Sequence, residues 1–297
     1  MKKMGTTPLA WAAAVCALLW AGCGRQEPAL AEPQTPEEMY ARVRELLQPN
    51  AQHEASDFAQ AMEWLRRAAE AGHRQAQTDL GGIYLEGGKG DVQADGKQAY
   101  DWFARAAAQG SREALYYMGL ILHAGKDVPQ DKPQALQLWR RAAEAGVAEA
   151  QLALGLELAQ AAGTVPEGVA WLTRAVQAEA AKTAAQAARA LGFIYAKGRP
   201  GVPQDLPEAA RWYKLAADGG DAAAQLVYAL MLLEGKPVAK NEAQGVRYLR
   251  LAAGQDYPAA MQMLAQLLRA AKNETEAAAW EQRLESLRQK AEAEAAH

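Results

Sequence analysis

Residues 187–220 read AARALGFIYAKGRPGVPQDLPEAARWYKLAADGG, and this stretch decides the fold. Its first part places Ala187, Leu191 and Tyr195 at intervals of four, and its second part has helical spacing around Trp212. Such intervals bring apolar side chains onto one face of a helix. A glycine closes each part, which suits the left-handed turn that often ends a helix. The stretch therefore predicts two short amphipathic helices joined by a loop.

The same two patterns recur along the chain, so the helix pair is a repeating unit. The pattern around Trp212 returns at intervals of 32 to 41 residues. Its copies start at Ala61, Ala99, Ala135, Gly168, Ala209, Gly245 and Ala277. The pattern with the Leu-Gly pair starts at Ala76, Ala114, Ala150, Ala187, Ala224 and Ala260. This repetition predicts an all-α solenoid, because each helix pair must cover its apolar face with the next pair.

The start of each second helix is marked independently by a capping-box pattern, in which a polar residue precedes Glu or Gln by three places. All seven copies carry such a pair. The pairs are Asp57/Gln60, Asp95/Gln98, Asp131/Gln134, Thr164/Glu167, Asp205/Glu208, Asn241/Gln244 and Asn273/Glu276. We therefore interpret the acidic members as helix caps and not as catalytic groups.

Two loops, Val128–Asp131 and Val202–Asp205, both read Val-Pro-Gln-Asp. Together with the two interlocking patterns they resemble the Sel1-like repeat, a short relative of the tetratricopeptide repeat, over about residues 57–280. The resemblance implies a right-handed α-solenoid of helix-turn-helix repeats. We assign residues 37–72 to N-terminal capping helices, 73–272 to the repeats, and 273–297 to a C-terminal capping helix and tail.

Both ends and one internal segment depart from the repeat. Four extra residues between Glu179 and Ala187 predict about one extra helical turn, and the loop between Ala161 and Gly168 is short. A helix over residues 37–48 is expected to place Tyr40, Val43 and Leu47 on one face. A final helix over residues 274–295 is expected to bury Trp280, Leu284 and Leu287.

The N-terminus resembles the signal peptide of a bacterial lipoprotein. Lys2 and Lys3 precede an apolar run, Leu9–Ala21, that has the length of a signal-peptide core. The run ends in Leu-Trp-Ala-Gly-Cys, which resembles the lipobox, with tryptophan at the position where leucine is usual. The resemblance implies that residues 1–22 are removed and that Cys23 is lipidated. The alternative is a plain signal peptide cut near Ala21.

Lipidation at Cys23 would anchor the protein in the cell envelope. Gly24 follows the cysteine, and by the usual sorting rule this favours the outer membrane, with the body facing the periplasm. Residues 23–36 contain three prolines and predict an extended tether of about 40 Å. A net charge of −3 gives no basic footprint for nucleic acid.

Helix-pair solenoids present their first helices along a concave groove. Tetratricopeptide geometry implies that a partner meets the positions two before, and two and five after, the Leu of each Leu-Gly pair. In the middle repeats these are Tyr116, Leu120, His123, Leu152, Leu156, Arg189, Phe193, Leu226, Leu230 and Leu233. An exposed apolar stripe would mark a site for a protein or peptide; the alternative is packing against neighbouring helices. The fixed register of Trp64, Trp102, Trp171, Trp212 and Trp280 predicts core positions between helices.

Motifs for chemistry are absent from the sequence. Ser56, Ser111 and Ser286 lie in neither Gly-x-Ser-x-Gly nor Ser-x-x-Lys. The four histidines lack metal-site spacing, and both cysteines lie within the first 23 residues. We interpret the glycine-rich segment 87–90 as a turn between helices. We therefore expect no catalytic residue, no cofactor and no bound metal.

These observations favour a binding module over an enzyme. The leading hypothesis is a membrane-tethered periplasmic scaffold or adaptor that binds a protein or peptide in its concave groove. The alternative is an immunity or inhibitor lipoprotein that neutralises a toxic effector enzyme such as a lipase. A third possibility, an enzyme acting on cell-wall material, lacks a recognisable site.

Overall fold

The computed structural model describes residues 33–47, 55–87 and 92–295. The predicted signal peptide, Cys23 and most of the predicted tether lie outside the described residues. The described part of the chain forms fourteen α-helices and no β-strand, which confirms the predicted all-α solenoid. The helices are α2 Pro36–Leu46, α3 Ala55–Glu70, α4 Arg74–Glu86, α5 Gly96–Ala108, α6 Arg112–Ala124, α7 Lys132–Glu144, α8 Ala148–Leu158, α9 Val165–Val176, α10 Ala181–Lys197, α11 Leu206–Asp218, α12 Ala222–Glu234, α13 Glu242–Gly254, α14 Pro258–Ala270 and α15 Glu274–Ala295.

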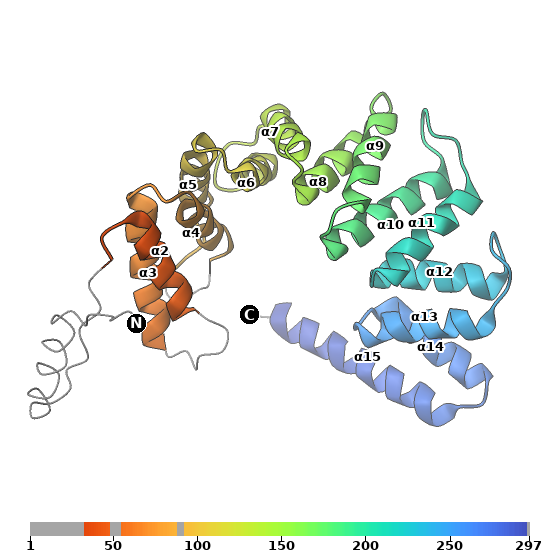
Figure 1. The fold of residues 1–297 in the computed structure, drawn as a ribbon. Helices are drawn as coiled ribbons and strands as arrows, with labels where there is room; N and C mark the ends of the chain where they lie inside the picture. The colour runs from red at the N-terminus through yellow and green to blue at the C-terminus, as the bar shows by residue number, and fades with distance from the viewer. Residues whose placement is uncertain (1–32, 48–54, 88–91, 296–297) are drawn as a thin grey trace, which may run out of the picture.

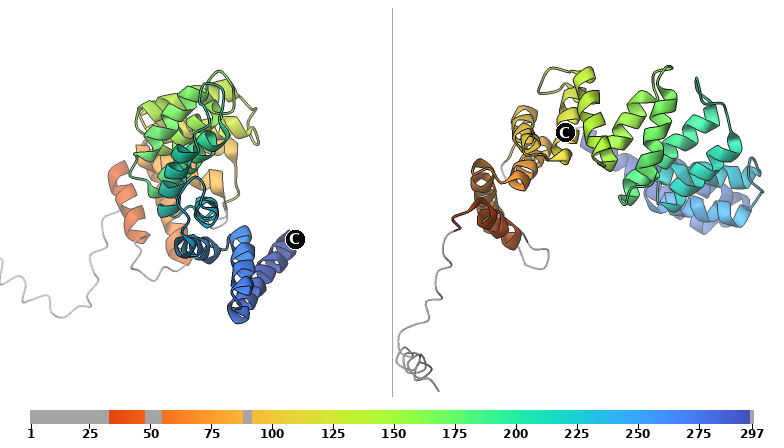
Figure 2. Two further views of the ribbon diagram at one scale, coloured as in Figure 1. Left: turned by 90° about the vertical axis from the view of Figure 1, so that its right-hand side faces the viewer. Right: turned by 45° about the horizontal axis from the view of Figure 1, so that its top comes forward.

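The helices form a continuous stack. We call the even-numbered helices from α4 to α14 first helices, and the odd-numbered helices from α5 to α15 second helices. Each first helix packs on the second helix that follows it, and that helix packs on the next first helix. The stack bends into an arc, with α6, α8 and α10 nearer its inside than α7, α9 and α11 (Figure 1). Turned by 90°, the same arc shows α15 displaced to one side of the N-terminal helices (Figure 2).

Most of the predicted second-helix caps form. The side chains of four caps accept the backbone N–H three residues later at 2.8 to 3.0 Å, and these are Asp95, Asp131, Asp205 and Asn241. Asn273 makes the same contact at 3.4 Å. One prediction is wrong. The Thr164 hydroxyl makes no cap bond at the start of α9, and it donates to the Leu158 carbonyl at 2.6 Å instead. Asp57 falls within α3, which begins at Ala55, and its side chain lies outside the described residues.

In four repeats a large side chain of the second helix packs over a glycine of the first helix. Phe103 of α5 is fully buried over Gly81 of α4, where an added Cβ would come within 2.9 Å of the ring. The equivalent pairs are Trp139 over Gly119, Leu172 over Gly155 and Tyr213 over Gly192. The small residue thus lets the two helix axes approach closely.

The five tryptophans predicted as core lie beside these central side chains. All five pack against the hydrophobic clusters. Trp171 is buried, at 6% exposed, and the other four are partly buried. An arginine three residues later covers four of the indoles at 4.1 to 5.6 Å from the ring centroid, and these arginines are Arg67, Arg105, Arg174 and Arg283. The predicted core position is therefore confirmed for Trp171, whereas the other four tryptophans lie at the edge of the core. A guanidinium stacks on four of the five rings.

The irregular repeat that contains α10 differs from its neighbours in the length of its first helix. Helix α10 has 17 residues, whereas α6 and α12 have 13, so the predicted extra turn is confirmed. Thr183, in this extra turn, donates a hydrogen bond to the Glu149 carboxylate of α8 at 3.3 Å. Helices α8 and α10 also contact each other directly. The extra turn thus ties two successive first helices together.

The N-terminal helix starts earlier than predicted. A complete capping box between Thr35 and Glu38 begins α2 at Pro36, which had been assigned to the tether. Val43 is buried as expected. Leu47 is 42% exposed, contrary to the prediction, because α2 ends one residue before it.

The C-terminal helix α15 covers the last repeat. It buries Ala277 and Leu284 against α14, while Trp280 and Leu287 are partly buried beside them. Across the described residues, no helix has both the length and the apolar character needed to cross a bilayer.

Candidate partner-binding surface

The ten predicted groove residues all lie on the first helices α6, α8, α10 and α12, but they differ in exposure. Five are half-buried against the core, and these are Tyr116, Leu120, Leu152, Leu226 and Leu233. Leu233, for example, lies against Gly245 of α13, where an added Cβ would come within 2.9 Å of its side chain. These five side chains shape the surface and are themselves held by packing.

Two apolar side chains remain open on adjacent first helices. Leu156 of α8 is 43% exposed and Phe193 of α10 is 48% exposed. Both stand two residues after the Leu of their Leu-Gly pair, and their helices contact each other. Leu230 holds the same position on α12 and is half-buried. We call Leu156 and Phe193 the α8–α10 patch.

The two basic side chains of the groove, His123 and Arg189, are engaged within the fold. The His123 Nε2 atom lies 3.3 Å from the Glu157 carboxylate, and its ring is 5.1 Å from that of Trp139. Arg189 donates to the Asp221 carboxylate at 2.9 Å. Asp221 is also the N-cap of α12, so Arg189 joins one first helix to the start of the next.

Tyr116 is held in place by its neighbours, and its side chain is uncharged. Its backbone carbonyl accepts the indole N–H of Trp139 at 3.1 Å. Burial, reinforced by the nearby Tyr117 and Glu149, raises the pKa of Tyr116 to about 12. The phenol therefore stays protonated across the physiological range and contributes apolar surface and a hydroxyl group, not a charge.

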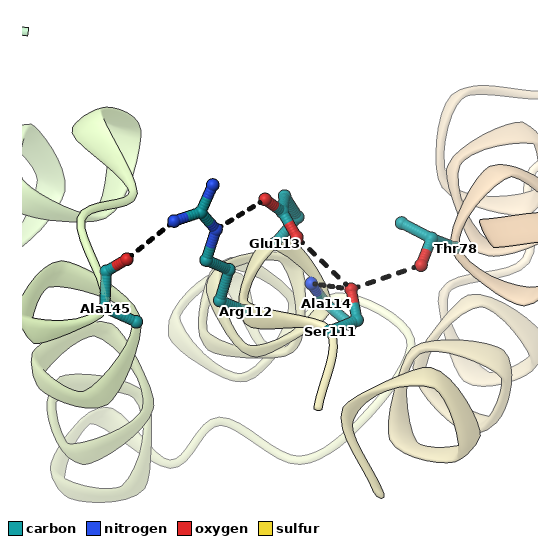
Figure 3. A network of polar contacts seen from close by, with 6 residues as sticks. All are labelled: Thr78, Ser111, Arg112, Glu113, Ala114 and Ala145. Atoms are coloured by element: carbon teal, nitrogen blue, oxygen red, sulfur yellow. Dashed lines mark hydrogen bonds and ion pairs between the residues drawn. The ribbon is translucent and has the colours of Figure 1, made fainter. Parts of the chain in front are cut away.

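A network of polar contacts joins α4, the start of α6 and the end of α7 (Figure 3). Ser111 caps α6 by accepting the Ala114 N–H at 3.2 Å, and its hydroxyl lies 3.3 Å from that of Thr78 on α4. Arg112 bridges Glu113 at 3.0 Å and the Ala145 carbonyl at the end of α7 at 2.9 Å. The start of α6 is therefore connected both to α4 and to the end of α7.

Glu113 is held charged in this network. Burial favours its neutral form, but hydrogen bonds from its own backbone and from Arg112 outweigh burial and lower the pKa of the carboxyl. Ser111 and Thr78 are both buried, so neither hydroxyl is offered to solvent. In the described residues Ser111 acts as a cap and Ser286 donates to the Arg283 carbonyl.

Sequence reasoning missed two basic residues that share the face of Phe193. Lys182 and Lys197 lie 11 residues before and four residues after it on α10. These intervals place all three on one side of a helix. The signal was readable from spacing alone, but the groove positions carried over from the repeat pattern did not include them.

Metal-binding clusters are not found in the described part of the chain. No group of three or more His, Cys, Asp and Glu side chains is placed to hold a metal ion there. Only part of the glycine-rich segment 87–90 is described, and Gly87 ends α4 by donating its N–H to the Ile83 carbonyl.

The fold and surface define a class of helical-repeat scaffold, and comparison identifies the family. The Sel1 repeat pattern matches residues 53–73, 74–111, 112–147, 185–221 and 222–257, which is more than half of the chain. The chain belongs to the Sel1 repeat family. Such a scaffold is suited to protein–protein interaction.

Solved structures share this fold. A Sel1 repeat protein from Oxalobacter formigenes is similar with a TM-score of 0.64 and 23% identity, covering 83% of this chain and 96% of its own. A protective antigen of uropathogenic Escherichia coli with an SLR fold has a TM-score of 0.51 and 23% identity, covering 85% of this chain and 62% of its own. None of the curated proteins matches the sequence.

Proposed function

We propose that this protein is a scaffold that binds a segment of a partner protein across the α8–α10 patch. The observation that carries the proposal is the exposure of Leu156 and Phe193 at the same position on two adjoining first helices. Large apolar side chains that are open to water on neighbouring elements are typical of interaction sites. Covering them with a partner side chain would remove apolar area from water and so favour association.

The surrounding residues support a preformed surface. Tyr116 and Leu120 on α6 and Leu152 on α8 are packed against the core. The bridges from Thr183 to Glu149 and from Arg189 to Asp221 hold α8, α10 and α12 in register. A partner therefore meets side chains that lose little freedom on binding, which lowers the entropic cost of association.

A capture experiment tests this proposal. The tagged chain is used to isolate bound proteins from its native host, beside a double variant with Leu156→Glu and Phe193→Glu. We expect the double variant to fold normally, because both side chains are exposed, and to lose the partner. A charge placed on each half of an apolar contact leaves that charge desolvated and unpaired.

A matched control separates this surface from general stickiness. Leu215 and Leu251 are exposed to a similar degree, at 47% and 45%, but lie on the second helices α11 and α13. The Leu215→Glu and Leu251→Glu double variant is expected to keep the partner. Equal capture by all three proteins would show that the α8–α10 patch is not the binding site. The identity of the partner then separates an adaptor from an inhibitor of a toxic enzyme.

We further propose that a lipid on Cys23 tethers the scaffold to the outer membrane, with its helical body facing the periplasm. The lipobox-like segment before Cys23 supports this location. Several acyl chains on one residue would anchor the protein firmly. Fractionation and mass spectrometry test it: the native chain should carry acyl chains and sediment with membranes. A Cys23→Ser variant that still sedimented with membranes would contradict the anchor.

A further inference from the structure

One face of α10 carries a basic stripe with Phe193 within it. Lys182, Gln186, Arg189, Phe193 and Lys197 follow one another at steps of four, three, four and four residues. Steps of three and four residues stack side chains on a single helix face. Four of the five residues are exposed and Gln186 is half-buried, so the stripe faces solvent.

The charge of this stripe is not neutralised within the described structure. Neither Lys182 nor Lys197 has an ion pair among the described residues, and α10 contains no acidic residue. Arg189 alone is paired, with Asp221. On α8, Glu157 contacts His123, and Glu149 accepts a hydrogen bond from the Thr183 hydroxyl without forming an ion pair with either lysine.

This arrangement is particular to α10. Among the first helices, it alone carries three basic and no acidic residues. The position of Arg189 is taken by Leu152 on α8 and by Leu226 on α12, and the position of Lys197 by Gln160 and Glu234. A local basic stripe in a chain of net charge −3 is therefore a property of this one repeat, not of the whole surface.

The dimensions suit a short segment of a protein. Lys182 and Lys197 are 15 residues apart, or roughly 22 Å along a helix. An extended chain covers that distance in about seven residues. At the Lys182 end, a cavity of about 340 Å³ opens between α10 and the loop before α12, with Gln186, Gly220 and Asp221 on its walls, and Asp221 is paired with Arg189. It is large enough to receive a side chain of the partner.

We propose that the α8–α10 patch recognises a segment that carries a large apolar side chain flanked by carboxylates. The apolar side chain covers Leu156 and Phe193, and the carboxylates meet Lys182 and Lys197. This inference rests on the proposed function and adds the chemistry of the partner. Complementary charge at the two ends of an apolar contact sets specificity and speeds association more than it adds affinity.

Selection from random peptides tests the proposal without knowledge of the natural partner. A phage-displayed library of dodecapeptides is selected on the full chain, and the enriched peptides are synthesised and their Kd measured. We expect the enriched set to combine aromatic or aliphatic residues with an excess of Asp and Glu. Enrichment of basic or neutral sequences, or no enrichment, would overturn the proposal.

Charge reversal gives the second arm. The Lys182→Glu and Lys197→Glu double variant should bind the selected peptides about tenfold more weakly, and added salt should no longer weaken its binding, because the new carboxylates repel the peptide and salt screens this repulsion. Its control, Arg66→Glu with Lys126→Glu, makes the same change in net charge at exposed residues outside α8 and α10 and should leave Kd unchanged. Equal weakening by both pairs, or by neither, would contradict the proposal.

A third variant shows whether a negative result contradicts only the preference for carboxylates or also the α8–α10 patch as the binding site. If Leu156→Ala with Phe193→Ala abolishes binding while the lysine reversals do not affect it, the surface is correct and the charge preference is wrong. If peptide binding survives both double variants, the α8–α10 patch is not the binding site, and both proposals fall.

Discussion

At the scale of single residues, the fold depends on a small residue that faces a large one. Gly119 is one such position, where an added Cβ would lie 2.5 Å from the Trp139 indole and 3.2 Å from the backbone oxygen of Ala135. Gly82 is also within a first helix, but an added Cβ there meets nothing within 4 Å. Two glycines of similar local conformation therefore have opposite roles.

The two glycines give opposite predictions for stability. We expect Gly119→Ala to lower the free energy of unfolding by ~1–3 kcal/mol through overpacking. We expect Gly82→Ala to raise it by about 0.5–1 kcal/mol, because alanine loses less backbone entropy in a helix. Urea denaturation followed by circular dichroism measures both. A stabilised Gly119→Ala protein would refute the close packing over this glycine.

Two phenylalanines provide a second contrast. Phe103 is fully buried, whereas Phe193 is 48% exposed. Phe103→Ala should cost ~3–5 kcal/mol of stability, because it removes a buried ring and leaves a cavity. Phe193→Ala should change stability by no more than about 0.5 kcal/mol. Similar losses in the two variants would mean that Phe193 belongs to the core and is not part of a free surface.

At the scale of helices, the caps were the most predictable feature because they are local. A side chain that accepts an N–H three residues ahead needs only its own neighbours, so sequence suffices at Asp95, Asp131 and Asp205. Thr164 failed because its hydroxyl is turned toward a carbonyl six residues earlier, to which it donates in the short α8–α9 connection. The position of that carbonyl is set by the fold, which the spacing does not reveal.

Asp131 tests the contribution of one cap. Its carboxylate accepts the Gln134 N–H at 2.8 Å at the start of α7. Asp131→Ala should lower the free energy of unfolding by about 1 kcal/mol, and Asp131→Asn should cost much less because the amide oxygen still accepts. Thermal unfolding measures the two variants. An alanine variant as stable as the asparagine variant would show that the cap does not stabilise α7.

At the scale of the whole molecule, sequence predicted the repeats but not which groove residues stay open. Helix pairing follows from apolar spacing within about 40 residues. Exposure depends on how far successive first helices stand apart, and this follows from the curvature of the whole stack. Leu156 and Leu230 therefore look equivalent in sequence, although Leu156 is 43% exposed and Leu230 is half-buried.

Helix α15 should stabilise the solenoid by capping its last repeat. Removal of residues 273–297 would uncover the face of α14 that Ala277 and Leu284 now bury. We expect the thermal midpoint to fall by roughly 5–10 °C and the protein to self-associate, because a terminal repeat needs a polar outer face. Removal of residues 288–297 alone keeps both buried side chains and should have little effect. Size-exclusion chromatography and thermal scans compare the two. An unchanged midpoint for the longer deletion would contradict the capping role of α15.

The central claim is that a partner sits on the inner face formed by α8 and α10. Its most direct measurement is photocrosslinking in the native host, with a photoreactive phenylalanine analogue at Phe193 or, as the matched position, at Leu251 of α13. Both side chains are exposed to a similar extent, at 48% and 45%. The account predicts a discrete crosslinked protein from position 193 that is lost when Leu156 is changed to Glu, and none from position 251. The same adduct from both positions, or none from position 193, would contradict it.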